Sequence, residues 1–399
     1  MTSSPREVGQ DDETMRSVVR LAHDLIRRPS RGGIDDYGPV LGVLEEWLTA
    51  RAVPHRRLHD SEGALVGLLV EVAGDRPGPW WTLDACVDTA PYGDSTRWTF
   101  HPTCGHVRDG WLLGRGAADS KLAAAMYCHL AADLAARGSG FAGGLAVLLD
   151  VDEHTGNFGG ARAYLADPDA ARPAGVIIGY PGMDEVVVGG RGLWRATIAV
   201  HAPSGHSGSS RTVTGAITRA ARLVGLLDAA ELPGPDGASG FPLGPKLTVT
   251  AFHGGEGFSV TPDRVDINVD VRTTPSFDAL DAESLVRKAA IELDAVLPAP
   301  FPTGVAEVAS WPAFRLEENE QPAAALLSAA RAAGLDVRAK TAGPSNIGNL
   351  LAGHGIPATA GFGVPYEGLH GIDERASLAE LPAVYAIHQR AVETLLDLR

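Results

Sequence analysis

Residues 80–88 read WWTLDACVD and residues 145–153 read LAVLLDVDE, and these two stretches decide the fold. Each is a continuous apolar run that ends in carboxylates, which is typical of a strand buried on both faces of a sheet. Similar runs occur at 65–72 (LVGLLVEV) and 176–181 (VIIGYP). Between the first two stretches, apolar residues recur at helical spacing from about 121 to 134. The order strand, helix, strand predicts an α/β fold, a mixed sheet flanked by helices.

The pattern changes at about residue 193. LWRATIAVHAP (193–203) and RVDINVDVRTTP (264–275) alternate apolar and polar residues, as strands with one solvated face do. Helical spacing resumes in PAAALLSAARAAGLDV, well after this region. We therefore expect an α+β domain at 193–312, inserted into a larger α/β domain formed by 1–192 and 313–399.

Composition limits the classes of function. The 399 residues are 45% hydrophobic and 21% charged, which is enough apolar material for a sizeable core. A formal net charge of −15 disfavours nucleic acid and anionic membrane surfaces, so a small molecule is the expected partner. Three scattered cysteines form no disulfide framework, and no stretch matches a secretory signal or a membrane span. We expect a cytoplasmic protein.

Residues suited to metal binding or acid–base chemistry follow the apolar runs, where open α/β sheets place their sites. Taken singly, each has an ordinary explanation: a packed thiol, a helix cap or a structural histidine. Their order along the chain makes them candidates for one site. They are Cys86, Asp88, Asp119, Glu153, His154, Tyr180 and His370.

Five sequence motifs together resemble those of a known family. They are DACVDTAP (84–91), WTFHP (98–102), DGWLLGRGAADSK (109–121), DVDEHTG (150–156) and GFGVPYEGLHGIDE (361–374). In this order they resemble the dinuclear-zinc aminoacylase and carboxypeptidase family, which includes acetylornithine deacetylase, succinyl-diaminopimelate desuccinylase, glutamate carboxypeptidase and cytosolic dipeptidases. In the inserted domain, APSGHSG resembles the family's lid histidine motif and TPDRVDINVDVRTTP its arginine strand. The resemblance implies a zinc-peptidase-like catalytic domain and an inserted lid domain through which the chain forms a homodimer.

The resemblance also implies roles. Asp119 matches a ligand that bridges two zinc ions, His370 matches the C-terminal ligand, and Glu153 matches the general base. Asp88 matches a carboxylate that orients the first ligand. In the lid, His206 matches a histidine that reaches the substrate carbonyl, and Arg272 matches an arginine that can hold a substrate carboxylate; a structural aspartate is the simpler partner for it. The Asp119–Ser120 peptide is expected to be cis, as in the family.

Four positions depart from the family pattern. Cys86 replaces a histidine, His154 replaces the second glutamate of a pair, Tyr180 replaces a carboxylate, and Ser259 replaces an asparagine in the lid. Asp119, His154 and His370 still form a set that can hold one zinc ion. The set of Cys86, Asp119 and Tyr180 has lost a carboxylate, so a second ion is expected to bind weakly or not at all, unless a Cys86 thiolate holds a soft metal.

Several alternatives stay open at this stage. Cys86 is a packed thiol, a metal ligand or an activated nucleophile, and Tyr180 fills the altered site or donates a hydrogen bond to the substrate. The leading hypothesis is metal-dependent hydrolysis of the amide bond in a small N-acyl amino acid or dipeptide-like substrate that carries a carboxylate. The alternative is a non-hydrolytic member, such as a transferase, condensing enzyme, cyclase or isomerase. A metabolite-binding or scaffold protein is the third hypothesis.

Overall fold

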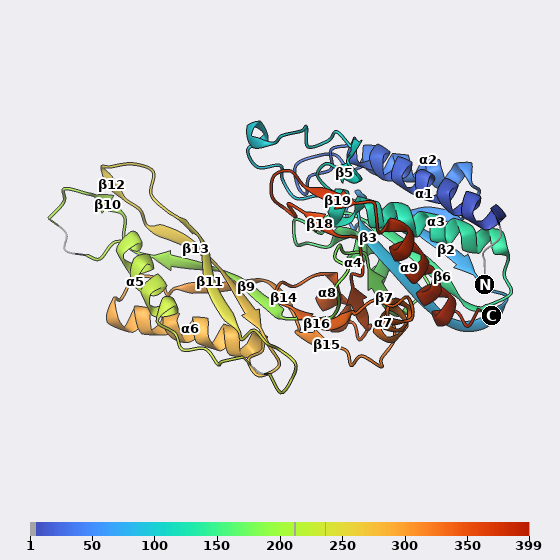
Figure 1. Ribbon diagram of the computed structural model, residues 1–399. Coiled ribbons are helices and arrows are strands. Elements are labelled where there is room, and N and C mark those ends of the chain that lie inside the picture. Colours follow the sequence, from blue (N-terminus) through green and yellow to red (C-terminus); the bar gives the residue numbers. More distant parts are fainter. Residues whose placement is uncertain (1–4, 211–212, 236, 399) are drawn as a thin grey trace. The chain divides into compact units, whose positions relative to one another are not determined.

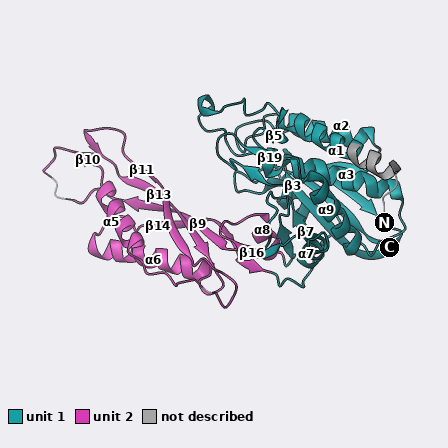
Figure 2. Ribbon diagram, in the orientation of Figure 1, with its two compact units in different colours: residues 1–188, 316–340, 355–399 teal, residues 189–315, 341–354 magenta. Residues whose placement is uncertain are grey.

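The computed structural model describes residues 5–210, 213–235 and 237–398. The chain divides into two compact units (Figure 2): one comprises 1–188, 316–340 and 355–399, and the other 189–315 and 341–354. The second unit thus contains the inserted segment expected at 193–312 and also residues 341–354, which the sequence placed in the larger domain. The side-chain amide of Asn349 explains this difference, because it donates to the carbonyls of Arg191 and Pro312, both in the second unit.

A large mixed sheet (Figure 1) has the strand order β1-β2-β6-β3-β7-β17-β8-β15, with β16 pairing β8, and its strands β1, β2, β3, β6, β7 and β17 lie in the first unit. The central strand β3 runs parallel to both β6 and β7, and β17 runs parallel to β7. The strands are β1 (His55–His59), β2 (Leu65–Ala73), β3 (Arg76–Cys86), β6 (Ala142–Asp150), β7 (Pro173–Ile178), β8 (Glu185–Gly190), β15 (Phe314–Arg315), β16 (Arg338–Ala342) and β17 (Ala358–Ala360).

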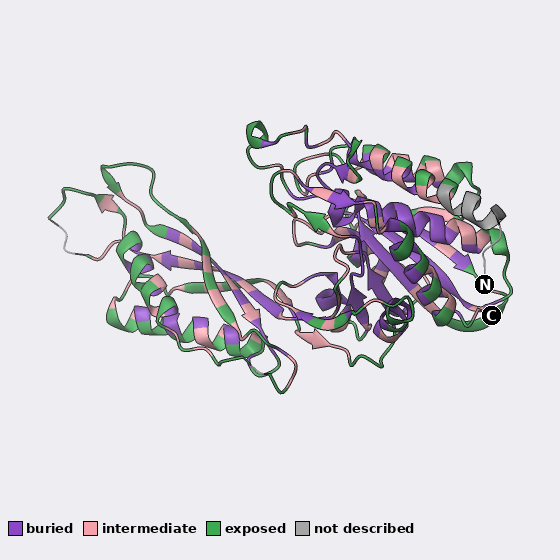
Figure 3. Cartoon of the chain, viewed as in Figure 1, coloured by how far each residue is buried: buried purple, intermediate pink, exposed green. Residues whose placement is uncertain are grey.

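The apolar runs of the sequence form the middle of this sheet, and the α/β prediction is confirmed. The last eight residues of β6 and the last five of β3 are buried, and Figure 3 shows the central strands as the most enclosed part of this unit. Helices flank the sheet: α1 (Pro5–Ile26), α2 (Gly38–Ala50), α3 (Leu122–Arg137), α4 (Gly159–Ala166), α7 (Ala323–Ala332) and α9 (Leu381–Leu395). Within the described ranges, no helix combines the length and hydropathy needed to cross a bilayer.

A small antiparallel sheet with the order β18-β19-β5-β4 accompanies the main one. Its strands are β4 (Val107–Arg108), β5 (Trp111–Leu113), β18 (Tyr366–Glu367) and β19 (Arg375–Ser377). A short 3₁₀ turn, η1 (Ser95–Arg97), precedes β4, and an irregular helical turn, η2 (Ala117–Lys121), leads from β5 into α3. This sheet therefore joins two distant segments, one that leads to Asp119 and one that follows His370.

The second unit is an antiparallel sheet with the order β11-β13-β9-β14, packed against two helices. Buried and part-exposed residues alternate along β9 and β13, as the sequence pattern predicts. The elements are β9 (Gly192–His201), β11 (Lys246–His253), β13 (Arg264–Thr273), β14 (Gly304–Trp311), α5 (Ala216–Asp228) and α6 (Ala279–Val296). A two-stranded ribbon, β10 (Gly205–His206) with β12 (Val260–Thr261), and α8 (Ile347–Gly353) complete it.

Candidate active site

The site forms where β3 and β6 end side by side in the first unit. The Val87 amide donates to the Asp150 carbonyl at 2.8 Å, so the segments that follow the two strands leave the sheet together. Asp88 follows β3, and Glu153 and His154 follow β6 after a turn in which Asp152 has a left-handed φ of 75°. The parallel register thus brings together residues more than sixty positions apart in the sequence.

Three side chains converge on one point. Nε2 of His370 lies 2.9 Å from Oδ2 of Asp119, and Nε2 of His154 lies 3.7 Å from the same oxygen. The ligand-type atoms of these three residues all lie within 4.8 Å of one another. Asp119 is buried and His370 is exposed, so the cluster opens to solvent on one side. The Asp119–Ser120 peptide is cis, as expected.

The charges of the cluster favour a cation. Burial acts to lower the pKa of His154, but the adjacent carboxylates of Asp119 and Asp88 outweigh it and raise that pKa to about 11. Burial acts to raise the pKa of Asp119, but the two imidazoles hold it well below its usual range. The two carboxylates therefore favour positive charge at this position. A metal ion would meet the same negative field.

Asp88 fixes the backbone of the segment after β6. Its carboxylate is fully buried and accepts the amide hydrogens of Glu153 at 3.2 Å and His154 at 3.0 Å. Oδ2 of Asp88 also lies 3.3 Å from Nδ1 of His154. A carboxylate at Nδ1 orients an imidazole so that Nε2 points toward a ligand position. Asp88 thus lies beside His154, whose Nδ1 makes no hydrogen bond of regular geometry with the described residues.

Glu153 lies beside the cluster with one carboxylate oxygen engaged. Its Oε1 accepts a hydrogen bond from the Tyr180 hydroxyl, whereas its buried Oε2 has no hydrogen-bond partner among the described residues. Burial, with the charge of Asp119, raises the pKa of Glu153 to about 7. A carboxylate with a pKa close to neutral can both accept and return a proton at physiological pH.

Cys86 and Tyr180 add no negative charge to the site. Burial, followed by the nearby carboxylates, raises the pKa of the Cys86 thiol and of the Tyr180 phenol well above their ordinary values. Sγ of Cys86 lies 4.0 Å from Oδ1 of Asp119 and also groups with Asp88 and His154. Two neutral groups therefore stand where the sequence comparison expected ligands of a second metal, and Tyr180 is already bonded to Glu153.

Sequence reasoning missed a buried ion pair that supports Asp119. Arg115 and Glu374 are almost completely buried and form a salt bridge. Oε1 of Glu374 also accepts the amide hydrogens of Gly116 and Ala118, each at 3.0 Å, and thereby holds the turn that presents Asp119. Both charged residues lie inside motifs already noted, GRGAAD and GIDE, and the position of Arg115 between two glycines is the one signal that could have drawn attention to the pair.

The three candidate residues of the inserted segment lie in the second unit. His206 on β10 and Ser259 before β12 are neighbours, because the Ser207 amide donates to the Ser259 carbonyl at 2.9 Å. Arg272 on β13 pairs with Asp270 at 2.8 Å and donates to Oγ of Ser345 at 3.1 Å. The structural aspartate considered from the sequence is thus Asp270.

Two further carboxyl groups lie buried in the sheet next to the site. Asp84 on β3 and Asp150 on β6 are 0% exposed, and no hydrogen-bond partner of either carboxyl is found in the described part of the chain. In the parallel register Asp84 opposes Leu148 and Cys86 opposes Asp150, so the two aspartates occupy neighbouring positions on one face. Burial raises the pKa of both, and the charge of Asp84 raises that of Asp150 further.

The Asp150→Asn variant is expected to be more stable than the unmodified protein at pH 7, by about 1–3 kcal/mol, because a neutral amide needs no proton to be buried. The folded-state pKa of Asp150 lies above its ordinary value of 3.8, so the folded protein binds a proton that the unfolded chain releases. The contribution of Asp150 to stability is therefore complete below the unfolded pKa and is lost as the pH rises.

Thermal unfolding measured between about pH 5 and pH 8 checks this expectation. The stability difference between Asp150→Asn and the unmodified protein should grow with pH. Asp228→Asn, at an exposed helix end, is the matched control and should follow the unmodified protein. A variant less stable than the unmodified protein at pH 8 would contradict the burial of an uncompensated acid.

Comparison with known proteins decides the family. Residues 84–394, which contain all the clustered side chains described above, match the model of peptidase family M20/M25/M40. The chain belongs to this family. Enzymes of peptidase family M20 bind metal ions and hydrolyse amide bonds, and this chain is a member of that enzyme class. The resemblance expected from the five motifs is thus confirmed.

Relatives and solved structures agree with the M20 assignment. The chain is 30% identical over 397 residues to a succinyl-diaminopimelate desuccinylase from Stenotrophomonas maltophilia, covering 96% of this chain and 100% of the relative. An M20 metallo-carboxypeptidase from Sulfolobus solfataricus superposes with a TM-score of 0.78 at 15% identity, covering 96% and 99% of the two chains. A dinuclear metal binding M20 peptidase from Bacillus subtilis superposes with a TM-score of 0.72 at 15% identity, covering 97% and 100%.

Proposed function

We propose that this chain is a zinc-dependent amidohydrolase that cleaves a small N-acyl amino acid or dipeptide-like substrate with a single zinc ion. The observation that carries the proposal is the convergence of His154, His370 and Asp119 beside Glu153. The donor set fits zinc, because two imidazoles and one carboxylate with an open fourth position are a common catalytic zinc arrangement. The chemistry that zinc supplies when bound is Lewis acidity, which lowers the pKa of water and polarises a carbonyl.

The residues of this chain would move the proton. Glu153 would accept a proton from the attacking water at its unbonded Oε2 and then deliver it to the nitrogen of the leaving amine. The pKa of Glu153, raised to about 7, suits both steps. Asp88 would keep His154 oriented through Nδ1 and would hold the backbone that carries Glu153. Tyr180 would fix the Glu153 carboxylate through its hydrogen bond.

A second zinc ion is not part of the proposal. A cation there would have Asp119 as the one carboxylate among the expected ligands, and burial raises the pKa of the Cys86 thiol in the metal-free protein, so a thiolate ligand would have to form at a cost. The Tyr180 hydroxyl donates a hydrogen bond to Glu153, and a neutral phenol is a poor zinc ligand. Of the alternatives left open, we carry forward a packed thiol for Cys86 and, for Tyr180, an aromatic side chain that fills the altered site, since its hydroxyl donates to Glu153.

The second unit would supply contacts to the substrate. His206 is proposed to stabilise the oxyanion, Ser259 to contact the substrate, and Arg272 to hold its carboxylate. Support for Arg272 comes from the local charge. The Asp270 carboxylate pairs with Arg272 and also with Arg195, whose Nε lies 2.7 Å from Oδ2 of Asp270, so two guanidinium groups share one negative charge.

Homodimerisation through this unit and a cytoplasmic location are also proposed, the latter because all three cysteines are free thiols. The relatives named above give no support to the non-hydrolytic alternative.

A substrate panel tests the proposal. Zinc-loaded protein is incubated with N-succinyl and N-acetyl amino acids and with dipeptides, and the released amine is quantified by mass spectrometry. Hydrolysis of at least one class is expected, together with its loss on chelation and its return on addition of zinc. Hydrolysis that survives chelation, or a zinc-loaded protein inert toward the whole panel, would contradict the proposal.

A further inference from the structure

One buried side chain lies between segments that carry residues of the candidate active site. Arg115 is 2% exposed, and Nη2 of its guanidinium donates to the Pro91 carbonyl at 3.0 Å, in the segment that begins with Asp88. The same nitrogen donates to the Gly371 carbonyl at 2.7 Å, directly after His370. Because a guanidinium is planar and its donors have fixed directions, these bonds fix the distance between the two segments.

The partner of this arginine, Glu374, holds a third segment. Nη1 of Arg115 donates to Oε2 of Glu374, and the other carboxylate oxygen, Oε1, faces the turn that presents Asp119. Oε1 accepts the amide hydrogens of Gly116 and Ala118, each at 3.0 Å, and that of Asp119 at 3.4 Å. One carboxylate thus fixes the backbone of this turn, and through Arg115 the turn is joined to the other two segments.

The turn that carries His370 has a backbone that needs such support. His370 and Asp373 each have a left-handed φ of 57°, a conformation that residues other than glycine rarely adopt. Arg115 holds the turn at the Gly371 carbonyl, and the Thr99 amide holds it at Oδ1 of Asp373, at 2.8 Å. A disfavoured conformation persists only where surrounding contacts determine it, so loss of the guanidinium should let this turn relax.

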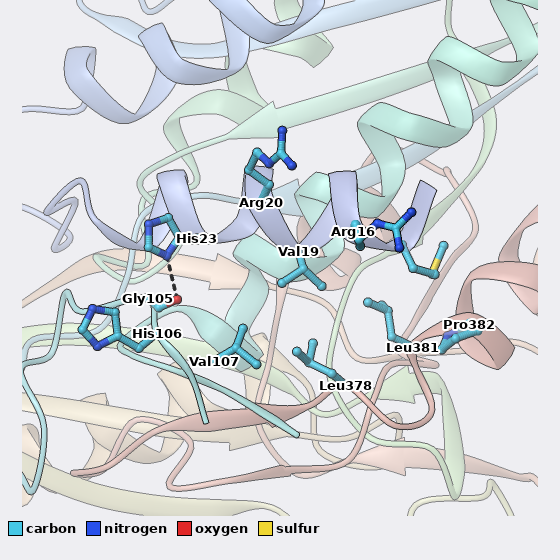
Figure 4. Close-up of a pocket in the computed structure, with 11 residues that line it drawn as sticks. Arg16, Val19, Arg20, His23, Gly105, His106, Val107, Leu378, Leu381 and Pro382 are labelled. Atoms are coloured by element: carbon cyan, nitrogen blue, oxygen red, sulfur yellow. Dashed lines mark hydrogen bonds between the residues drawn. The ribbon is translucent and has the colours of Figure 1, made fainter. Parts of the chain in front are cut away.

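The backbone that carries Arg115 is itself held in place. Its amide donates to the Pro102 carbonyl at 2.7 Å. The loop that contains Pro102 is joined to α1, because Nδ1 of His23 donates to the Gly105 carbonyl at 2.8 Å (Figure 4). Gly105 has a φ of 62°, and a Cβ there would lie 2.9 Å from the His23 carbonyl oxygen, so only glycine permits this approach. The guanidinium therefore projects from a backbone that is anchored to a helix.

We propose that Arg115 and Glu374 are positioning residues for the zinc-binding set, which fix Asp119 relative to His370 and thereby raise the affinity for zinc. This role rests on the proposed function, since the ion is part of that proposal. Within the described ranges, the groups of side chains able to hold a metal ion include neither residue, so both would act through the ligands. A buried ion pair is often no more stabilising than apolar side chains of similar volume, whereas partners that orient ligands strongly affect metal affinity.

Competition with a chromophoric zinc chelator, on the full-length protein, tests the proposal without an activity assay. Arg115→Lys keeps the positive charge beside Glu374 but cannot serve that carboxylate and two carbonyls together, so zinc affinity should fall by about tenfold or more. Glu374→Gln keeps the shape and one acceptor oxygen but leaves the arginine without an anion, and a similar or larger fall is expected. With cobalt(II) in place of zinc, the visible absorption of both variants at saturation should differ from that of the unmodified protein, because these bands depend on coordination geometry.

Thermal unfolding of the same samples separates positioning from stability. Arg219→Lys makes the same exchange at a buried arginine of the second unit, which pairs with Asp294. It should lower the unfolding temperature while zinc affinity and the cobalt spectrum stay unchanged. Glu393→Gln, in the surface pair with Arg137, should leave all three properties unchanged.

The outcomes distinguish this role from the proposed function. Zinc binding by the unmodified protein, with the same affinity and cobalt spectrum in Arg115→Lys and Glu374→Gln, would overturn the positioning role alone. Arg115→Lys keeps the charge balance of the core and decides the question if Glu374→Gln does not fold. An equal loss of affinity in Arg219→Lys would trace the effect to general destabilisation and would also overturn the role. An unmodified protein that binds no zinc would overturn the proposed function, and the positioning role with it.

Discussion

The Glu153→Gln variant should lose roughly 10²–10⁴-fold in kcat while keeping its zinc, because glutamine has the same shape but cannot carry the transferred proton. Two features of Glu153 make it the group to test. Its Oε2 has no hydrogen-bond partner in the described ranges, and burial brings its pKa to about 7. The Tyr180 hydroxyl can still hydrogen-bond to the amide oxygen, so the side chain should keep its place.

Steady-state kinetics on the best substrate of the panel, together with metal analysis of the same samples, gives the answer. The substrate KM and the zinc content should change little, which separates loss of proton transfer from loss of the site. Glu62→Gln, at an exposed turn position, is the matched control and should retain full activity. A Glu153→Gln enzyme as active as the unmodified protein would rule out the proposed acid–base role.

The Asp119→Asn variant should lose both metal and activity. Asp119 contacts both imidazoles of the cluster through Oδ2, and it is the only carboxylate of the proposed zinc-binding set. Replacing it removes one negative charge from a buried position, so zinc affinity should fall by at least about a hundredfold. Competition with a chromophoric zinc chelator measures that affinity directly and without an activity assay.

The control for this variant makes the same aspartate-to-asparagine exchange at a position away from the cluster. Asp109→Asn lies at an exposed turn with a φ of 52°, a conformation that asparagine tolerates well. It should bind zinc like the unmodified protein. Zinc affinity that is the same in Asp119→Asn, Asp109→Asn and the unmodified protein would mean that Asp119 is not a ligand.

The sequence was sufficient for the features that depend on local pattern. The apolar runs around 83 and 147 predicted buried strands, because a strand covered on both faces needs apolar side chains on both. Carboxylates and imidazoles placed directly after such runs predicted that Asp88, Glu153 and His154 would meet at one edge of the sheet. These inferences need only the strand direction and the chain order, and both can be read from a single sequence.

Features that depend on register and side-chain conformation could not be read in this way. The neighbouring burial of Asp84 and Asp150 follows from which residue of β3 opposes which residue of β6. The Tyr180–Glu153 hydrogen bond depends on the rotamers of two side chains that are 27 positions apart. Residues 341–354 join the second unit through the amide of Asn349, and no apolar periodicity signals a contact made by one polar side chain.

The central claim is that one zinc ion is held by two imidazoles and the Asp119 carboxylate. Anomalous diffraction at the zinc absorption edge, from crystals of zinc-replete protein, tests it most directly. The predicted result is a single strong peak per chain, within bonding distance of Nε2 of His154, Nε2 of His370 and the carboxylate of Asp119. Absence of any peak, or a second peak of equal height beside Cys86 and Tyr180, would contradict it.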